Sequence, residues 1–207
     1  SIEKIISLPN ILGQITNMTF QPTGIKVGEM VVPIGVIFMI YESRPNVTID
    51  SACLSIKSGN AIILRGGSES FFTNTLLYKS IRQSLKKNNL PPNLVQYLKS
   101  SNRDLINEIL KKDEYVDLVI PRGGKNLIRS VINNSSIPVL KHLDGVCHLY
   151  IDSYANESMA LKLTINSKTQ RLSTCNTLET LLVHAQHKNS LLKKIGTQLK
   201  KKGIKIF

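Results

Sequence analysis

Short apolar runs alternate with amphipathic stretches along most of the chain, beginning at Val31. The run over residues 31–40 carries no charged side chain, as expected of a strand that is covered on both faces. Strands that alternate with helical patterns predict a parallel sheet flanked by helices. The predicted strands cover residues 31–40, 61–64, 94–98 and 116–120, with residues 137–140 closing the series. The predicted helices cover residues 47–56, 68–87, 102–112 and 125–133.

A second, smaller unit is predicted after residue 143. It has a strand over residues 146–151, a helix over 156–167, a loop over 168–176, a strand over 178–183 and a basic helix that ends at Lys202. The pattern therefore predicts an α/β protein with two domains, residues 1–143 and 144–207. Parallel sheets bind their ligands at the carboxyl ends of the strands, so unusual residues at those ends are the candidates for function.

Composition narrows the class of protein. The 207 residues are 42% hydrophobic with no Trp, and no apolar run has the length of a membrane span or the form of a signal peptide. We therefore expect a soluble protein that does not enter a membrane. Cys53, Cys147 and Cys175 are widely spaced and form no closely spaced Cys/His set, which argues against a disulfide framework or a metal site. A reducing, cytoplasmic compartment is expected.

The formal charge of +13, from 27 basic and 14 acidic residues, raises the question of a nucleic-acid partner or a phosphorylated small molecule. Charge alone does not decide between them. Much of the excess lies in lysine runs near the predicted helix ends, where cations complement the helix dipole. No aromatic residues for base stacking are interleaved with these lysines, so solvated lysines are favoured over a nucleic-acid surface. The runs begin at Lys86, Lys111, Lys193 and Lys200.

Two strand–Gly–Gly–helix junctions are candidate phosphate sites. One is Arg65, Gly66 and Gly67, and the other is Pro121, Arg122, Gly123 and Gly124. Glycines let a phosphate approach the N–H groups at a helix start, and the adjacent Arg supplies charge. Neither junction matches a standard nucleotide motif, and each alone is equally well explained as a tight βα turn. Two such turns at equivalent strand ends favour a dinucleotide site.

Cys175 is a candidate nucleophile because it lies in a polar predicted loop rather than in apolar surroundings. Lys168 and Arg171 in the same loop favour the thiolate form of a nearby cysteine. Most lone cysteines are packing residues, and this explanation stays open for Cys175. Cys53, in a predicted helix, and Cys147, in a predicted strand, are expected to belong to the core.

Arg44 and Asn46 follow the most hydrophobic strand. An Asn amide can donate a hydrogen bond to a developing oxyanion, and Arg can meet a carboxylate or phosphate. The alternative is an ordinary Asn near a helix start. The four histidines, His142, His148, His184 and His187, have no spacing that implies a metal or a catalytic triad, so they are expected to be structural or to lie on the surface.

At these same places the chain resembles gamma-glutamyl phosphate reductases, a branch of the aldehyde dehydrogenase superfamily. The similar stretches occur in order between about residues 17 and 184. They are residues 32–37, 41–48, 57–69, 117–124, 147–152, 166–171 and 175–183. The resemblance implies a Rossmann-like NADP-binding domain over residues 1–143 and the beginning of a catalytic domain over residues 144–207.

The resemblance also implies an activity, the second step of proline biosynthesis from glutamate. The Cys175 thiolate would attack the acyl phosphate carbon of L-glutamate 5-phosphate and expel phosphate, leaving a thioacyl enzyme. NADPH would then supply hydride to give L-glutamate 5-semialdehyde. The backbone N–H of Cys175 and the side chain of Asn46 would hold the oxyanion.

Cofactor and substrate residues are implied in the same way. Arg65, Ser68 and Glu69 would lie near the adenosine ribose and its 2′-phosphate, and Gly123 and Gly124 near the pyrophosphate. The remaining residues of the two turns complete the cofactor set: Gly66, Gly67, Pro121 and Arg122. Arg44, Lys168 and Arg171 are assigned to the substrate's anionic groups from their charge and position.

The chain departs from the family pattern in several respects. Leu172 stands where the family usually has Pro, and residues 141–145 replace a more glycine-rich stretch. A family segment before this chain and a long one after it are expected to be missing, so that about half a reductase is present. The complete protein is expected to be a homo-oligomer and to associate with glutamate 5-kinase. The alternatives are a catalytically incomplete remnant that keeps the fold, and a basic nucleic-acid-binding domain, which the resemblance disfavours.

Overall fold

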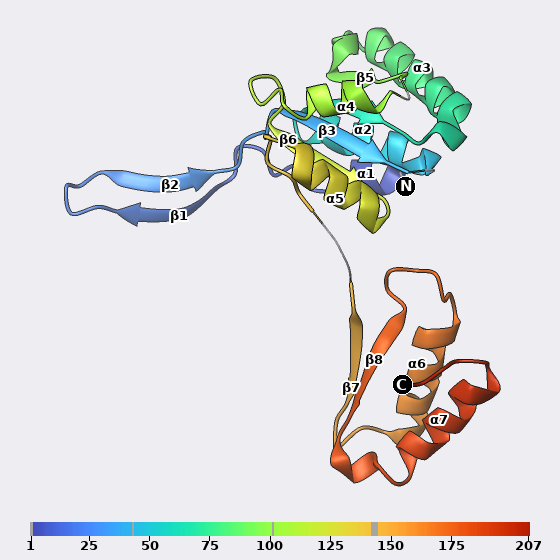
Figure 1. The fold of residues 1–207 in the computed structure, drawn as a ribbon. Coiled ribbons are helices and arrows are strands. Elements are labelled where there is room, and N and C mark those ends of the chain that lie inside the picture. The colour runs from blue at the N-terminus through green and yellow to red at the C-terminus, as the bar shows by residue number, and fades with distance from the viewer. Residues whose placement is uncertain (1, 43, 101, 142–144) are drawn as a thin grey trace. The chain divides into compact units, whose positions relative to one another are not determined.

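The computed structural model describes residues 2–42, 44–100, 102–141 and 145–207. The chain forms two compact units, Ser1–His142 and Leu143–Phe207 (Figure 1). Each unit has its own parallel sheet and its own buried apolar clusters, and each is described by itself.

The sheet of unit 1 is parallel and has the strand order β5-β4-β3-β6. Its strands are β3 (Val36–Tyr41), β4 (Ala61–Arg65), β5 (Val95–Tyr97) and β6 (Leu118–Arg122). The longer helices are α2 (Pro45–Lys57), α3 (Phe71–Lys87), α4 (Arg103–Ile109) and α5 (Lys125–Asn134). The short helical elements are α1 (Ile2–Ser7), η1 (Ser68–Ser70) and η2 (Pro92–Leu94). The predicted parallel sheet with flanking helices is confirmed.

Both faces of β3 are buried, which explains its uncharged sequence. Ile37 and Tyr41 belong to one core cluster, which also contains side chains of α2 and α3. Phe38 and Ile40 point to the opposite face and belong to a second cluster with Val119. A strand that is covered on both sides has a continuous run of apolar residues rather than alternating apolar and polar residues.

The strand predicted over residues 31–40 is shorter than expected, because β3 begins at Val36. Gly35 precedes it with a φ of 125°, a conformation that residues with a side chain rarely adopt. The Asp117 carboxylate fills the space beside Gly35 and accepts the N–H of Val36 at 2.7 Å. This contact joins the starts of β3 and β6. The apolar residues before Gly35 therefore precede the sheet.

The sequence pattern gave no prediction for the antiparallel hairpin of β1 (Ile15–Phe20) and β2 (Lys26–Met30). Every residue of both strands is exposed, including Phe20 and Met30. Without a buried face, the hairpin lacks the alternation by which a half-buried strand is recognised.

Unit 2 pairs two parallel strands and packs two helices on them. Its elements are β7 (Cys147–Ile151), α6 (Glu157–Thr169), β8 (Leu178–Val183), η3 (Ala185–His187) and α7 (Leu191–Lys201). Leu191, Ile195 and Leu199 lie one helical turn apart on α7 and are buried against Ile151 and Ala160.

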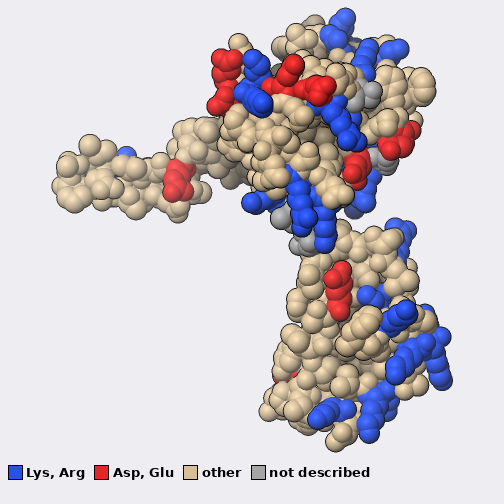
Figure 2. Space-filling view, viewed as in Figure 1, with Lys and Arg blue, Asp and Glu red and all other residues tan. Residues whose placement is uncertain are grey.

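Basic side chains are spread over unit 1 and gather on the side of unit 2 where α6 and α7 lie (Figure 2). Lys86 and Lys87 occupy the last turn of α3, as predicted. Lys193 and Lys194 do not lie at a helix end that favours cations, because α7 begins at Leu191. In the described residues, no helix is both long and apolar enough to cross a membrane.

Candidate functional site

Three turns of unit 1 lie at one edge of its sheet, because β3 pairs with β4 on one side and with β6 on the other. The turn after β4 contains Gly66 and Gly67, the turn after β3 contains Arg44 and leads into α2, and the turn after β6 contains Gly123 and Gly124. The chain leaves β3 toward β4 and β5 and returns to the opposite side as β6 (Figure 1). Such a reversal of strand order is where open parallel sheets bind ligands.

The turn after β6 is held by Glu42, the residue that follows β3. The backbone N–H of Glu42 donates to the Arg122 carbonyl at 3.0 Å. Its Oε2 accepts the N–H of Gly124 at 3.0 Å, and a Cβ on Gly123 would lie 2.5 Å from its Cδ. Pro121 and Arg122 belong to β6 rather than to the turn where they were predicted.

Glu42 was not singled out as a functional candidate from the sequence. The available signal was a carboxylate directly after an apolar strand and two residues before the Arg44 candidate. Its importance depends on pairing with Gly124, 82 residues away. No local pattern identifies a contact at that separation.

The turn after β4 packs on a buried polar triad. Thr48 of α2 donates to Asn74 Oδ1 of α3 at 3.0 Å, and its hydroxyl lies 2.6 Å from the Tyr41 hydroxyl. Because the Thr48 proton goes to Asn74, Tyr41 must be the donor to Thr48. A Cβ on Gly66 would lie 2.2 Å from Asn74 Nδ2, so this position needs glycine.

The triad is kept out of water. Tyr41, Thr48 and Asn74 are each 0% exposed. Burial raises the pKa of Tyr41 to about 12, although the hydrogen bond with Thr48 opposes this shift. The phenol therefore stays protonated and remains a donor. The three side chains link the end of β3, the first turn of α2 and the part of α3 that lies beside Gly66.

Arg65 is the last residue of β4 rather than part of the turn. It is half-buried, and its Nε is buried without a hydrogen-bond partner among the described residues. Ser68 and Glu69 are exposed on η1, a 3₁₀ turn that precedes α3, so the helix predicted to start at Ser68 starts at Phe71. Gly67 is buried before η1.

Arg44 and Asn46 flank the start of α2. Arg44 is the N-cap residue, Pro45 occupies the first turn and Asn46 follows it. Both Arg44 and Asn46 are exposed. Asn46 lines an open cavity of about 580 Å³ together with Glu3, Ile49 and Leu77.

Cys175 lies in an exposed turn of unit 2 between α6 and β8. The Sγ of Cys147, at the start of β7, donates to the Cys175 carbonyl at 3.4 Å. Thr174 and Thr177 both donate from their hydroxyls to the Arg171 carbonyl, which closes the turn. The thiol of Cys175 is thus presented on an internally bonded turn.

Lys168 lies in the last turn of α6, not in a loop, because the helix continues to Thr169. Arg171 is exposed just beyond it, in the segment that contains Cys175. The other two cysteines, Cys53 and Cys147, are half-buried and belong to none of the described core clusters, so the prediction that they lie in the core is not met. Burial, and then the nearby Asp50 carboxylate, raise the pKa of the Cys53 thiol.

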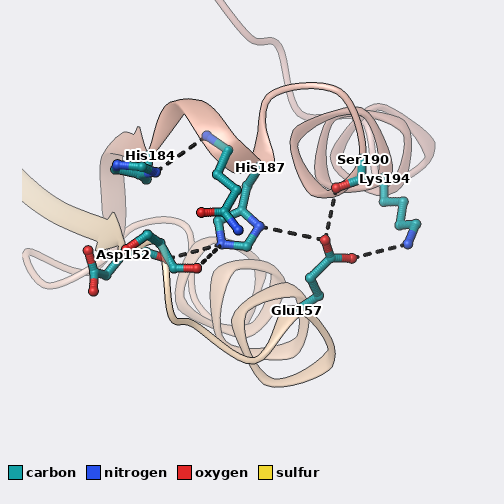
Figure 3. Close-up of polar contacts among 8 residues, drawn as sticks. Asp152, Glu157, His184, His187, Ser190 and Lys194 are labelled. Atoms are coloured by element: carbon teal, nitrogen blue, oxygen red, sulfur yellow. Dashed lines mark hydrogen bonds and ion pairs between the residues drawn. The ribbon is translucent and has the colours of Figure 1, made fainter.

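A polar cluster supports the loops at the other end of unit 2 (Figure 3). The buried ring of His187 places Nε2 3.0 Å from the Asp152 carbonyl and Nδ1 3.6 Å from Glu157 Oε1. Ser190 donates to Oε1 of the same carboxylate at 2.8 Å, and Lys194 lies 3.3 Å from Oε2. The hydrogen bond from Ser190, followed by that from Lys194, lowers the pKa of Glu157.

The histidines present no metal site in the described part of the chain, where no three His, Cys, Asp or Glu side chains form a metal-binding group. His187 is buried and structural, whereas His148 and His184 are exposed. His142 lies outside the described residues.

The family follows from comparison with known proteins. Residues 8–205 match the model of the aldehyde dehydrogenase family. The chain belongs to this family. It is 47% identical over 206 residues to the gamma-glutamyl phosphate reductase of Ruthia magnifica, covering 100% of this chain and 49% of that protein. It is 48% identical over 200 residues to the same enzyme of Psychrobacter arcticus, covering 97% of this chain and 46% of that protein.

A solved structure agrees with these relatives. The crystal structure of gamma-glutamyl phosphate reductase from Thermotoga maritima is 40% identical and superposes with a TM-score of 0.89. It covers 98% of this chain, which in turn covers 49% of that protein. The chain thus spans about half the length of the relatives that it matches, and its resemblance to gamma-glutamyl phosphate reductases is confirmed.

Proposed function

We propose that the chain carries the core of an NADPH-dependent reductase that converts L-glutamate 5-phosphate to L-glutamate 5-semialdehyde and phosphate. The observation that carries the proposal is the 47% identity to a reductase of that name over the whole chain. The exposed Cys175 and the two glycine turns lie within the matched region.

In the proposed reaction, Cys175 Sγ bonds to the acyl carbon of the substrate, and phosphate leaves with the electrons of the broken C–O bond. Asn46 donates its amide N–H to the oxyanion that forms at this carbon, together with the backbone N–H of Cys175. A bound nicotinamide would supply the hydride to the thioester carbon, and breakage of the C–S bond would then release the semialdehyde and restore the Cys175 thiolate. Arg44, Lys168 and Arg171 are proposed to bind the substrate's anionic groups.

The residues of unit 1 fit a dinucleotide. The Gly123–Gly124 turn opens α5, where an N–H group and the helix dipole favour a phosphate. Arg65 at the end of β4 has a buried Nε without a partner in the described chain and supplies positive charge beside Ser68 and Glu69. We assign these residues, with Gly66, Gly67, Pro121 and Arg122, to the cofactor.

The decisive test is the reverse reaction, the phosphate-dependent oxidation of glutamate semialdehyde by NADP. The chain is assayed alone and after fusion to the flanking segments of the Ruthia magnifica reductase. Activity of the fusion supports the proposal, and activity of the chain alone shows that the core suffices. An inactive, folded fusion favours the alternative of a remnant that keeps only the fold.

Cys175→Ser in the active protein is expected to abolish turnover and to leave the dissociation constant for NADPH unchanged, because the thiol and the cofactor turns lie on different segments. Cys53→Ser is the matched control and is expected to retain activity, since Cys53 is a half-buried residue of α2. Steady-state kinetics and calorimetric titration measure the two quantities. Undiminished turnover in Cys175→Ser contradicts the proposed mechanism.

A further inference from the structure

The carboxylate of Glu42 has no role in the proposed reaction, although it occupies a position of functional interest. Its Oε2 accepts the N–H of Gly124, the residue that caps the N-terminus of α5. The side chain comes from the other side of the turn, at the end of β3, and lies where a Cβ on Gly123 would be. Glu42 is therefore a negatively charged group on the proposed diphosphate site.

A carboxylate and a phosphate are attracted to a helix start for the same reasons. Both accept hydrogen bonds from unpaired N–H groups, and both are stabilised by the positive end of the helix dipole. The first turn of α5 contains no acidic residue of its own, so the carboxylate at its N-terminus is that of Glu42, which comes from outside the helix. A ligand phosphate that binds the Gly124 N–H has to displace the Glu42 carboxylate.

Displacement is compatible with the rest of the structure. The Glu42 side chain is exposed, so it has room to rotate into water. Its backbone N–H remains bonded to the Arg122 carbonyl at 3.0 Å, which keeps β3 joined to the end of β6. The exchange requires movement of one side chain and leaves the turn in place.

We propose that Glu42 sets the affinity of this turn for the cofactor's diphosphate, by holding the Gly124 N–H with its own carboxylate until the ligand replaces it. The inference rests on the proposed function, because the diphosphate belongs to the proposed cofactor. Glu42 acts as an internal competitor, which tunes how readily the cofactor is released. Removing its charge should therefore tighten binding, whereas a purely structural or ligand-contacting role predicts weaker binding.

The test is calorimetric titration of the 207-residue chain and its Glu42→Gln variant with NADPH, inorganic pyrophosphate and adenosine 2′-monophosphate. An anion at a helix start contributes a few tenths to about 1 kcal/mol, so Glu42→Gln should bind NADPH about two- to fivefold more tightly. Pyrophosphate should show the same direction. Adenosine 2′-monophosphate lacks the 5′-diphosphate, so its affinity should be unchanged.

Glu114→Gln is the matched control, because it removes the same charge from an exposed turn before β6, at the opposite end of that strand. It should leave all three affinities unchanged, and thermal melting verifies that both variants fold. Equal or weaker binding of NADPH by Glu42→Gln overturns the inference. If neither the chain nor its variants bind NADPH, the proposed cofactor is wrong, and the pyrophosphate titrations then test the role of Glu42. Tighter binding of pyrophosphate by Glu42→Gln supports that role, and unchanged or absent binding overturns it.

Discussion

At the scale of single residues, Thr48 joins two core side chains that have no access to water. Thr48→Val keeps the shape of the side chain but removes both hydrogen bonds, leaving Tyr41 and Asn74 with buried polar atoms to satisfy. We expect a loss of about 1–3 kcal/mol in the free energy of unfolding, measured with urea. Thr48→Ser keeps the hydroxyl and should recover most of this loss. Equal destabilisation by the two variants would mean that the methyl group, not the triad, matters.

The two glycine turns differ in what surrounds them, and alanine substitution should reveal the difference. A Cβ at Gly66 meets Asn74, which is completely buried and held by Thr48. A Cβ at Gly123 meets the exposed side chain of Glu42, which can move away. Gly66→Ala is expected to cost about 1–3 kcal/mol and Gly123→Ala distinctly less, again by urea unfolding. The reverse order would contradict the packing described for Gly66.

At the scale of elements, Glu157 connects the start of α6 to η3 and α7. Its pKa is lowered from the ordinary 4.5, first by the Ser190 hydrogen bond, so the folded state favours the carboxylate. A depressed carboxyl pKa stabilises the fold above the unfolded-state value, and this stabilisation is lost as the pH falls through the folded-state value. The contribution of Glu157 should therefore be complete at neutral pH and decline as the pH falls below the unfolded-state pKa of about 4.3.

Glu157→Gln should accordingly lower the melting temperature of the chain at pH 7, and the difference from the wild type should shrink as the solution is acidified toward pH 3. Scanning calorimetry at a series of pH values measures this. Glu179→Gln, an exposed glutamate on β8, controls for the change in net charge. A difference that is constant over the whole pH series would show that the carboxylate charge is not the cause.

The β1–β2 hairpin is a separate element with no buried residue in its strands. Gln14 and Val31 are hydrogen-bonded at its base, where Val31 N–H donates to the Gln14 carbonyl at 2.9 Å. Replacing residues 15–30 by Gly-Gly should therefore close the chain without strain and change the free energy of unfolding of unit 1 by less than about 1 kcal/mol. Urea unfolding followed by far-UV circular dichroism tests this, and a loss of several kcal/mol would contradict it.

At the scale of the whole molecule, the sequence was informative where side chains are buried. The alternation of apolar runs with amphipathic stretches predicted a parallel sheet, and the structure confirms it. The predicted strand began too early because Pro33 and Gly35 interrupt the strand geometry of the apolar run. Hydrophobicity alone does not show where such a run is interrupted. The hairpin was missed because its strands have no buried face.

The candidate site was only partly predictable for a related reason. Some candidates are local features at strand ends and can be identified from the sequence individually: Arg65, Gly66, Gly123 and Gly124. Glu42 and Asn74 act through contacts with Gly124 and Thr48 that lie far away along the chain. Such partners are determined by strand order, which the alternation of apolar and polar segments does not specify.

The central place of β3 also has a consequence for the chain as it is synthesised. Val36 binds Asp117 across 81 residues, so one edge of β3 has no partner until β6 has left the ribosome. During that interval the nascent chain presents an open, uncharged strand edge, which is a template for pairing with other chains. Chaperone capture of stalled chains should consequently be strongest for those that end between β4 and β6, and should fall once β6 covers this edge of β3.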